Sequence, residues 1–481
     1  MSNLSELIPA GGGQNNTDFV ASGAITSGKP VILNSAGTVT QVGMAAASSV
    51  GIGTAVVYDA GTNTDNSIAY DSSSNKVVVG YRSSTTGYGV VGTVSGTSIS
   101  YGSATAMTGQ DKDTRETSMS YDSTNNKVVM SFRSNNDYYG YAIVGTVSGT
   151  SISWGTPVNF NSSGTYYTNC IYDSANSKIV IAFQDGGNSL YGTAIVGTVS
   201  GTSISFGTKA VFNAAESSVF IKQAYDSSSN KVIITTMDEG NSGRGNAVVG
   251  TVSGTSISFG TNVLYSTSRA GAQSIAFDTV ANKVVIAYAD GGNSDYGTAI
   301  VGTVSGTSIS FGTAAVFNTA SASQTSCSYD TGADRTIISY KNNSPSSGKV
   351  IAGAVSGTSI SFNTASAFDA PTSIDSVYDS SAGKVVTVYT NSTGRSVVLS
   401  ALATNLTATN LLGIASAAIL DTATGTINTW GSRNEVQTSL TIGSDYYVQS
   451  DGTITTASAS PAQLIGQAIT ATQINIKDYT G

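Results

Sequence analysis

The stretch VGTVSGTSISFGT recurs through the chain and decides its fold. It occurs whole at Val196–Thr208, Val249–Thr261 and Val301–Thr313. Near-copies begin at Val91, Val144 and Ala352, so successive copies start 51 to 53 residues apart. A fixed period of this length indicates one supersecondary unit that is repeated along the chain.

A second motif, Tyr-Asp-x-x-x-x-Lys, marks the same period. Five copies lie at Tyr70–Lys76, Tyr121–Lys127, Tyr172–Lys178, Tyr225–Lys231 and Tyr378–Lys384. Two variants lie at Phe277–Lys283 and Tyr329–Arg335. Together the two motifs indicate seven repeats.

The two ends of the repeat region complement each other. The last repeat stops at Ser396–Thr404 with no ISFGT after it, whereas Val50–Tyr58 (VGIGTAVVY) aligns with Ile309–Phe317 (ISFGTAAVF). A ring needs this division, because one of its sheets is completed by strands from both chain ends. The sequence therefore predicts an all-β fold, a seven-bladed β-propeller with four-stranded blades of about 52 residues and velcro closure.

Repeat five shows the expected blade. Its four strands are predicted at Gln273–Phe277, Lys283–Ala289, Gly297–Val304 and Ser308–Phe317. The second and third are continuously apolar, which is typical of sheets covered on both faces. The aromatic residues of the fourth strand are expected to pack between the outer blade edges; they are Tyr101, Trp154, Phe206, Phe259, Phe311 and Phe362.

The two chain ends lack the period. Residues 17–45 and 405–481 both contain short apolar runs separated by glycine turns. We expect them to form one small β domain into which the propeller, residues 46–404, is inserted, because a closed ring brings its own two ends together. Residues 1–16 are expected to be an extended N-terminal arm.

Composition excludes several classes of function. Lys and Arg number 21 against 29 Asp and Glu, a net charge of −8, which argues against nucleic acid as a partner. No apolar run is long enough to predict membrane insertion, and the start predicts no secretory signal. Histidine is absent, which removes the commonest general base. Cys170 and Cys327 occupy equivalent positions three repeats apart, and we expect both to be buried and unpaired.

Alternating strand direction places the connections of each blade on two faces. The Tyr-Asp turns and the Ser-Gly-Thr turns share one face, the turn face, and hardly vary. The loops between the second and third strands and the linkers between blades share the other, the loop face, and do vary, as binding loops on a rigid scaffold do. The predicted binding residues are Arg82, Tyr88, Arg133, Asp137, Tyr138, Tyr139, Asp185, Asn188, Tyr191, Asp238, Arg244, Asp290, Asn293, Asp295 and Tyr296.

These residues suit binding better than catalysis. Exposed tyrosine beside Asn, Asp and Ser can stack on sugar rings or contact protein, although the tyrosines can also pack under their own loops. The DGGNS loops at Asp185 and Asp290 lack the spacing of a calcium loop, so a plain Asx turn is favoured and no metal is expected. The scattered arginines do not match a sialidase-type site, so no catalytic residue and no cofactor are predicted.

The chain ends resemble known phage proteins. LIPAGGG…FVASGAITSGKPVILNSAGTVT is similar to the amino-terminal segment of structural proteins of tailed bacteriophages, marine ones especially. GIASAAI…GTINTWG…LTIGSDYYVQSDGTITT…IGQAITATQINIK resembles a small β module of phage tail-fibre and capsid-fibre proteins. The two stretches cover about 100 residues. This resemblance implies a virion protein, in an appendage on the exposed surface or tail.

Three hypotheses follow. The first is a non-enzymatic virion structural protein whose propeller loops recognise a host-surface glycan or protein. The second is a purely structural decoration or joint, and the third is a glycan-active enzyme. The expected partners are other virion proteins, bound through the small β domain and the N-terminal arm, and further copies of this chain in a homo-oligomer.

Overall fold

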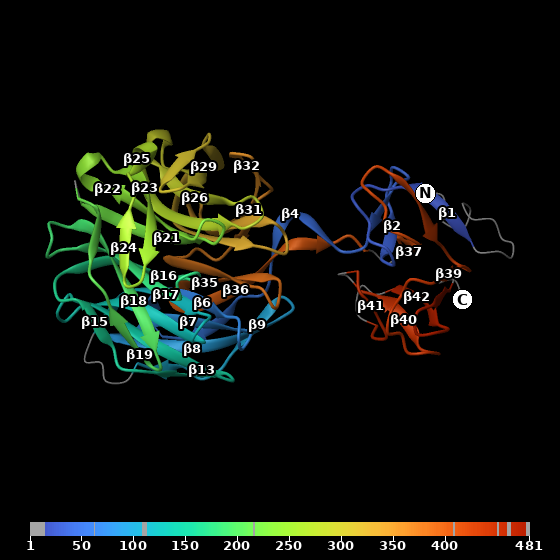
Figure 1. Cartoon of the computed structure of the whole chain (residues 1–481), viewed down its shortest axis with the longest axis horizontal. Coiled ribbons are helices and arrows are strands. Elements are labelled where there is room, and N and C mark those ends of the chain that lie inside the picture. The colour runs from blue at the N-terminus through green and yellow to red at the C-terminus, as the bar shows by residue number, and fades with distance from the viewer. Residues whose placement is uncertain are drawn as a thin grey trace. The chain divides into compact units, whose positions relative to one another are not determined.

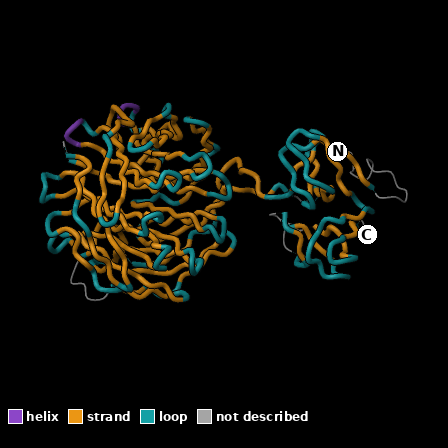
Figure 2. Tube along the Cα trace, in the orientation of Figure 1, coloured by secondary structure: helices purple, strands orange, loops and turns teal. Residues whose placement is uncertain are grey.

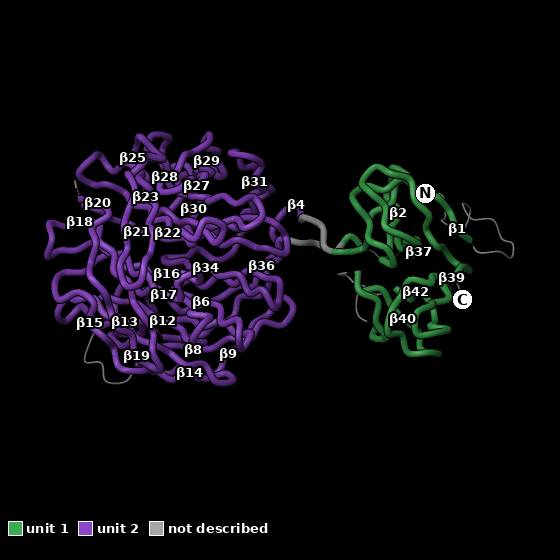
Figure 3. Tube along the Cα trace, in the orientation of Figure 1, with its two compact units in different colours: residues 1–46, 402–481 green, residues 47–401 purple. Residues whose placement is uncertain are grey.

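The structure is a computed structural model that describes residues 15–61, 63–107, 113–214, 217–406, 409–449, 452–458 and 463–477. The chain divides into two compact units, one of residues 47–401 and one of residues 1–46 with 402–481 (Figure 3). Strands make up most of the described chain (Figure 2). Two short 3-10 turns, η2 (Glu239–Asn241) and η3 (Gly291–Asn293), interrupt them.

The described residues of the larger unit form seven antiparallel blades, of which the fourth to sixth are joined into one 13-stranded sheet. The blades are numbered in chain order, and their strands are labelled in Figure 1. Blade 1 has β6 (Asn63–Asp71), β7 (Lys76–Ser83), β8 (Thr86–Ser95), β9 (Ser98–Tyr101) and β10 (Thr105–Ala106). Blade 2 has β11 (Thr114–Asp122), β12 (Lys127–Ser134), β13 (Gly140–Ser148), β14 (Ser151–Trp154) and β15 (Val158–Asn161). Blade 3 has β16 (Thr165–Asp173), β17 (Lys178–Asp185), β18 (Tyr191–Ser200), β19 (Ser203–Phe206) and β20 (Ala210–Asn213).

The next three blades share two long strands. Blade 4 has β21 (Ser218–Asp226), β22 (Lys231–Asp238), β23 (Arg244–Ser253), β24 (Ser256–Phe259) and the start of β25 (Val263–Asp278). Blade 5 has the rest of β25, β26 (Lys283–Asp290), β27 (Tyr296–Ser305), β28 (Ser308–Phe311) and the start of β29 (Ala315–Asp330). Blade 6 has the rest of β29, β30 (Arg335–Asn343), β31 (Ser346–Ser356), β32 (Ser359–Phe362) and β33 (Ser366–Phe368).

Blade 7 is completed by strands from both ends of the repeat region. It has β34 (Ser373–Asp379), β35 (Lys384–Asn391), β36 (Thr393–Thr404), β4 (Met44–Ile52) and β5 (Val56–Asp59). Both β4 and β5 pair with β36, and Val56 lies opposite Ser396. The predicted seven-bladed propeller with velcro closure is therefore confirmed.

The outer strand of each blade differs from the prediction. Ser308–Phe317 was expected to be one strand, but the structure divides it into β28 and the start of β29. The linkers around it also differ, because β25 and β29 each run without a break from the outer edge of one blade to the inner strand of the next. The division falls at Gly312, where the strand meets the neighbouring blade.

This glycine explains why FGT recurs in the repeat. A Cβ atom on Gly207 would lie 1.9 Å from the carbonyl oxygen of Thr255, in the Ser-Gly-Thr turn of the next blade. The equivalent Gly260 and Gly312 face Thr307 and Thr358 in the same way. No side chain fits at such a distance, so the turn of each blade seats on the glycine of the blade before it.

Blade 6 is the exception, and its sequence differs accordingly. Asn363 stands where the other blades have this glycine. Its neighbour, blade 7, has no Ser-Gly-Thr turn, because the chain enters there through β4. The Asn363 amide instead donates to the carbonyl oxygen of Ala47 at 3.3 Å.

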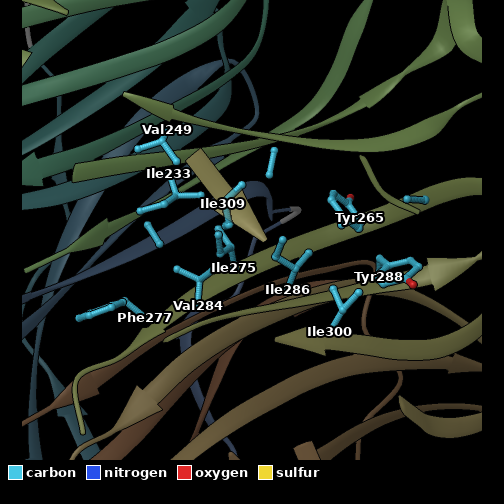
Figure 4. Close-up of a cluster of buried hydrophobic side chains, with 13 residues drawn as sticks. Ile233, Val249, Tyr265, Ile275, Phe277, Val284, Ile286, Tyr288, Ile300 and Ile309 are labelled. Carbon is cyan, nitrogen blue, oxygen red and sulfur yellow. The ribbon is translucent and has the colours of Figure 1, made fainter. Parts of the chain in front are cut away.

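The core of the propeller lies between blades. In one cluster, Ile233 and Val249 of blade 4 pack with Ile275, Ile286 and other residues of blade 5 (Figure 4). The outer-strand aromatics also pair across blades, as predicted. The pairs, with ring centroids 5.7 to 5.9 Å apart, are Tyr101–Tyr58, Phe206–Phe160, Phe259–Phe212, Phe311–Tyr265 and Phe362–Phe317.

The smaller unit consists of two five-stranded sheets in its described part. The first has the order β1-β38-β37-β2-β3, from β1 (Asn16–Val20), β2 (Pro30–Leu33), β3 (Val39–Gln41), β37 (Leu411–Ala415) and β38 (Thr424–Asn428). The second has the order β39-β43-β42-β40-β41, from β39 (Arg433–Asn434), β40 (Asp445–Val448), β41 (Ile454–Thr455), β42 (Gln463–Ala468) and β43 (Ile474–Ile476).

In the first of these sheets, β38 and β37 from the C-terminal end lie between β1 and β2 from the N-terminal end. The chain ends therefore form a small β domain together, as the fold prediction required. Of the predicted N-terminal arm, residues 1–14 lie outside the described residues, and Asn16 opens β1.

Candidate functional site

The inner strand of six blades carries a β-bulge near the loop face. Its register against the second strand shifts at this point in blades 1 to 6, whereas β34 of blade 7 pairs without a shift. In each bulge one non-glycine residue adopts a positive φ of 46° to 53°; these residues are Asp65, Glu116, Tyr167, Phe220, Ala272 and Gln324. Such a backbone is unfavourable for large side chains and is found where a bulge redirects a residue toward a site.

The bulge side chains connect consecutive blades. The Asp65 carboxylate accepts a hydrogen bond from the Glu116 backbone N–H at 3.0 Å. The Glu116 carboxylate in turn accepts one from the backbone N–H of Tyr167. The Tyr167 ring then packs on Phe220, with centroids 5.5 Å apart. Blades 1 to 4 are thus joined at this level by side chains that differ from blade to blade.

A cavity of about 480 Å³ opens beside this series of contacts. It is lined by Glu116, Tyr166, Tyr167, Gln184, Leu190, Ser217, Val219 and Glu239. These residues come from the starts of β11 and β16, from the start of β21 and the residue before it, from the end of β17, and from the residues that follow β17 and β22. The cavity therefore belongs to the loop face of blades 2 to 4. Its volume lies within the range of roughly 300–1,000 Å³ that small-molecule sites occupy.

Arg133 holds one wall of the cavity in place. Its guanidinium carbon lies 5.3 Å from the ring centroid of Tyr138 and 5.3 Å from that of Tyr166. Its Nε is 3.4 Å from a carboxylate oxygen of Glu116. A cation between two aromatic faces is attracted to both, so Arg133 orients Tyr166 and Glu116 together.

Burial and nearby charges shift the pKa values of two residues that line the cavity, Glu116 and Tyr167. Burial raises the pKa of the Glu116 carboxyl above its ordinary value, although nearby Arg133 opposes this change. Burial also raises the pKa of Tyr167, and the charges of Glu116 and Glu239 add to the effect. The Tyr167 hydroxyl is therefore neutral, and it lies in the negative field of two carboxylates.

A chain of polar groups forms another part of the lining. The Gln184 side-chain N–H donates to the Ser217 hydroxyl at 2.9 Å, and this hydroxyl donates to the exposed Glu239 carboxylate at 3.5 Å. The Glu239 backbone N–H donates to the Ser217 carbonyl oxygen at 3.0 Å. Fixed polar groups beside aromatic faces can orient a ligand that has hydroxyl or amino groups.

A second cavity, of about 240 Å³, is lined by the inner strands of all seven blades. Residues on its wall include Lys222, Asp375 and both cysteines. Burial raises the pKa of Asp375, against the opposing charge of Lys222. Cys170 and Cys327 are buried and unpaired, and burial raises their thiol pKa values to about 11 and about 12. Protonated thiols of this kind are poor nucleophiles.

No protein-family model and no curated protein sequence matches the chain. Its fold is similar to that in the crystal structure of the BP39L lectin from Burkholderia pseudomallei. The likeness covers 71% of this chain and 98% of the lectin, with a TM-score of 0.50 and 10% sequence identity. At this identity the likeness bears on the fold alone.

The described residues lack both a metal-ligand cluster and a membrane-spanning helix. Their Cys, Asp and Glu side chains form no group of three or more that could hold a metal ion. They also include no helix with the length and apolar character needed to cross a bilayer.

The predicted binding residues lie on the loop face, but none of the fifteen is among the residues that line the larger cavity. Arg133 contacts the lining residues Tyr166 and Glu116, and Tyr138 contacts Arg133. Arg82 pairs with Asp113 at 2.6 Å, and Tyr88 stacks on Tyr81.

Several predicted residues hold their own loops instead. Asp137 accepts from the Tyr139 backbone N–H and the Tyr141 hydroxyl. The carboxylate of Asp290 accepts from Gly292 N–H in η3, and Asp295 pairs with Arg269 at 2.9 Å.

Asp185 has a structural role that removes it from solvent. Its side chain is 2% exposed and accepts hydrogen bonds from Lys209, Ser163 and Asn161. Although burial opposes the effect, these bonds lower the pKa of the Asp185 carboxyl. The DGGNS loop at Asp185 is thus a turn whose first carboxylate faces inward, so Asp185 is unsuited to the predicted binding role.

The remaining predicted residues divide by exposure. Asp238 is buried and accepts from Asn246 at 3.4 Å. Tyr139, Tyr191, Tyr296 and Arg244 are half-buried, and Asn188 and Asn293 are exposed at loop tips.

Two of the cavity residues that sequence reasoning missed share one position in the repeat. Glu116 and Tyr167 each stand five residues before the tyrosine of the Tyr-Asp motif, where Asp65, Phe220 and Gln324 stand in other repeats. The position varies in size, charge and aromaticity inside an otherwise repetitive strand. That variation was a readable signal, but the predicted inner strand began after it.

Proposed function

We propose that this protein is a non-enzymatic recognition protein of a tailed-phage virion, whose propeller binds a saccharide of the host surface in the cavity of blades 2 to 4. The observation that carries the binding proposal is the cavity itself. It combines the faces of Tyr166 and Tyr167 with hydrogen-bonding groups of Gln184 and Glu239. Aromatic faces match the C–H surface of a sugar ring, and fixed polar groups match its hydroxyls.

Other observations support the two parts of the proposal separately. A protein of the same fold is described as a lectin, which agrees with binding rather than turnover. The virion assignment rests on the resemblance of the two chain ends to phage fibre modules. These ends form the smaller unit, which we propose as the part that joins other virion proteins.

Binding of the full-length protein to an array of bacterial surface glycans tests the proposal. Replacing Tyr166 by alanine removes one aromatic wall and should weaken saccharide binding about tenfold. Tyr296→Ala is the matched control, since Tyr296 is a half-buried loop-face tyrosine of blade 5 that does not line the cavity. Its binding should equal that of the wild type.

Two results would contradict the proposal. Equal losses in the two variants would remove the site from the cavity of blades 2 to 4. Release of shortened glycan during the incubation, lost in Glu116→Gln, would indicate an enzyme instead of a binding protein.

A further inference from the structure

The charged groups that line the cavity all have one sign. Glu116 and Glu239 both belong to the lining, and the eight described lining residues include no lysine or arginine. Both carboxylates line the same cavity as Tyr167 and raise its pKa.

The nearest cation pairs with one of the two carboxylates. Arg133 lies beside Glu116, with its Nε 3.4 Å from a carboxylate oxygen, and its guanidinium also contacts the rings of Tyr138 and Tyr166. Glu239 is exposed, and its carboxylate accepts only a long bond of 3.5 Å from Ser217 among the contacts of the described residues. One carboxylate thus has acceptor capacity to spare at the cavity surface.

A carboxylate next to an aromatic face attracts an ammonium group in two ways. The carboxylate accepts charge-assisted hydrogen bonds from it, and the electron-rich face of the ring attracts the cation. The same arrangement repels uronic acids, sialic acids and phosphorylated sugars, because their negative charge would face Glu116 and Glu239 without a lining cation.

We propose that the ligand of this cavity is an amino sugar with a free, protonated amine, held with its ammonium between Tyr167 and Glu239 and its ring against Tyr166. This inference rests on the proposed saccharide-binding function and narrows it to one chemical class. The N-acetylated form of the same sugar lacks the charge and is expected to bind more weakly.

Calorimetric titration of the full-length protein compares three probes of equal length: glucosamine oligomers, N-acetylglucosamine oligomers and galacturonic acid oligomers. The glucosamine oligomer should bind about tenfold more tightly than its N-acetylated counterpart, since a hydrogen bond to a charged group exceeds a neutral one by about that factor. The galacturonic acid oligomer should bind most weakly.

Glu239→Gln is the decisive variant, because this exposed residue can lose its charge without disturbing the core. It should weaken glucosamine binding about tenfold more than it weakens N-acetylglucosamine binding, because glutamine removes the charge on which only the amine depends. Glu435→Gln is the matched control, because it removes one exposed carboxylate from the smaller unit. It should leave the preference as it is.

The outcomes separate this inference from the function on which it rests. Equal or tighter binding of the neutral or acidic oligomer, lost in Tyr166→Ala, would overturn the amine preference and leave saccharide binding intact. Failure of every oligomer and every arrayed glycan to bind would overturn both.

Discussion

On the turn face the blades repeat one set of contacts, whereas on the loop face each blade differs from the next. The Asp71 carboxylate, for example, accepts from the backbone N–H groups of Ser73 and Ser74, and Asp226 does the same in blade 4. The hydroxyl of Tyr70 accepts from the Ser381 backbone N–H at 3.2 Å, which joins blade 1 to blade 7. At the opposite end of the same strand, Asp65, Glu116 and Tyr167 occupy equivalent bulges with unrelated side chains.

This difference separates the contacts that stabilise the ring from the surface that we propose binds a ligand. Contacts that close the ring need identical geometry in every blade, so the turn face and the glycine contact hardly vary. The proposed ligand needs one shaped surface, and among the described residues the variable bulges and loops of blades 2 to 4 line such a cavity.

The largest effect should come from the glycine contact. Gly207→Ala places a methyl group against the carbonyl oxygen of Thr255 and should cost about 2–3 kcal/mol of unfolding free energy by overpacking. Gly201→Ala is the matched comparison, because Gly201 has open space around it and a φ of +61°. It should cost only about 1 kcal/mol. Denaturant unfolding measures the cost of each substitution. Equal costs would contradict the claim that the Ser-Gly-Thr turn of each blade packs against the glycine of the preceding blade.

A smaller effect concerns Asp375 in the central cavity. Its carboxylate accepts from Ile68 of blade 1 at 3.1 Å and from Ser326 of blade 6 at 3.2 Å. Burial raises its pKa in the folded state, so the folded chain binds this proton more tightly than the unfolded chain. Its contribution to stability should therefore be greatest at acidic pH and decline as pH rises through the raised pKa.

Thermal unfolding of the wild type and of Asp375→Asn at a series of pH values measures this contribution. The difference between the two proteins should change across the acidic range, because asparagine does not titrate. A difference that stays constant with pH would show that the pKa of Asp375 is the same in the folded and unfolded chains.

The smallest effect tests the turn face. Phe277 stands where five complete motifs have tyrosine, so blade 5 lacks the hydroxyl that Tyr225 and Tyr378 offer to the preceding turn. Phe277→Tyr should stabilise the protein by about 0.5–1 kcal/mol through one added hydrogen bond, and Tyr225→Phe should destabilise it by a similar amount. Chemical denaturation measures the change in unfolding free energy of each variant. Changes of opposite sign would support a stabilising role for the tyrosine hydroxyl, and a loss of stability in both variants would contradict it.

The closure of the propeller ring could be predicted from the sequence because the repeat motifs show which blade is divided between the two ends of the repeat region. The missing ISFGT after Thr404 and its counterpart at Val50–Tyr58 predict the shared blade, and the pairing of β5 with β36 confirms it. Even the exception at Asn363 is visible in the sequence, although its cause, the missing turn of blade 7, needs the assembled ring.

The candidate site was harder to predict because repetition does not specify it. The most polar loops, such as DGGNS at Asp185, form hydrogen bonds within themselves and to neighbouring segments of the chain. The cavity instead uses residues at strand starts, which a bulge turns toward the neighbouring blade. A bulge has no strong sequence signature in non-glycine residues, so the proximity of Glu116, Tyr167 and Glu239 could not be read from their separation in the chain.

The central claim is that the variable bulges of blades 2 to 4 build a saccharide site. A crystal structure of the full-length protein grown with a glucosamine oligomer tests it most directly. The account predicts density for a sugar ring against Tyr166, with its amine beside Glu239. A well-ordered oligomer bound at other blades or on the turn face, with this cavity empty, would contradict it.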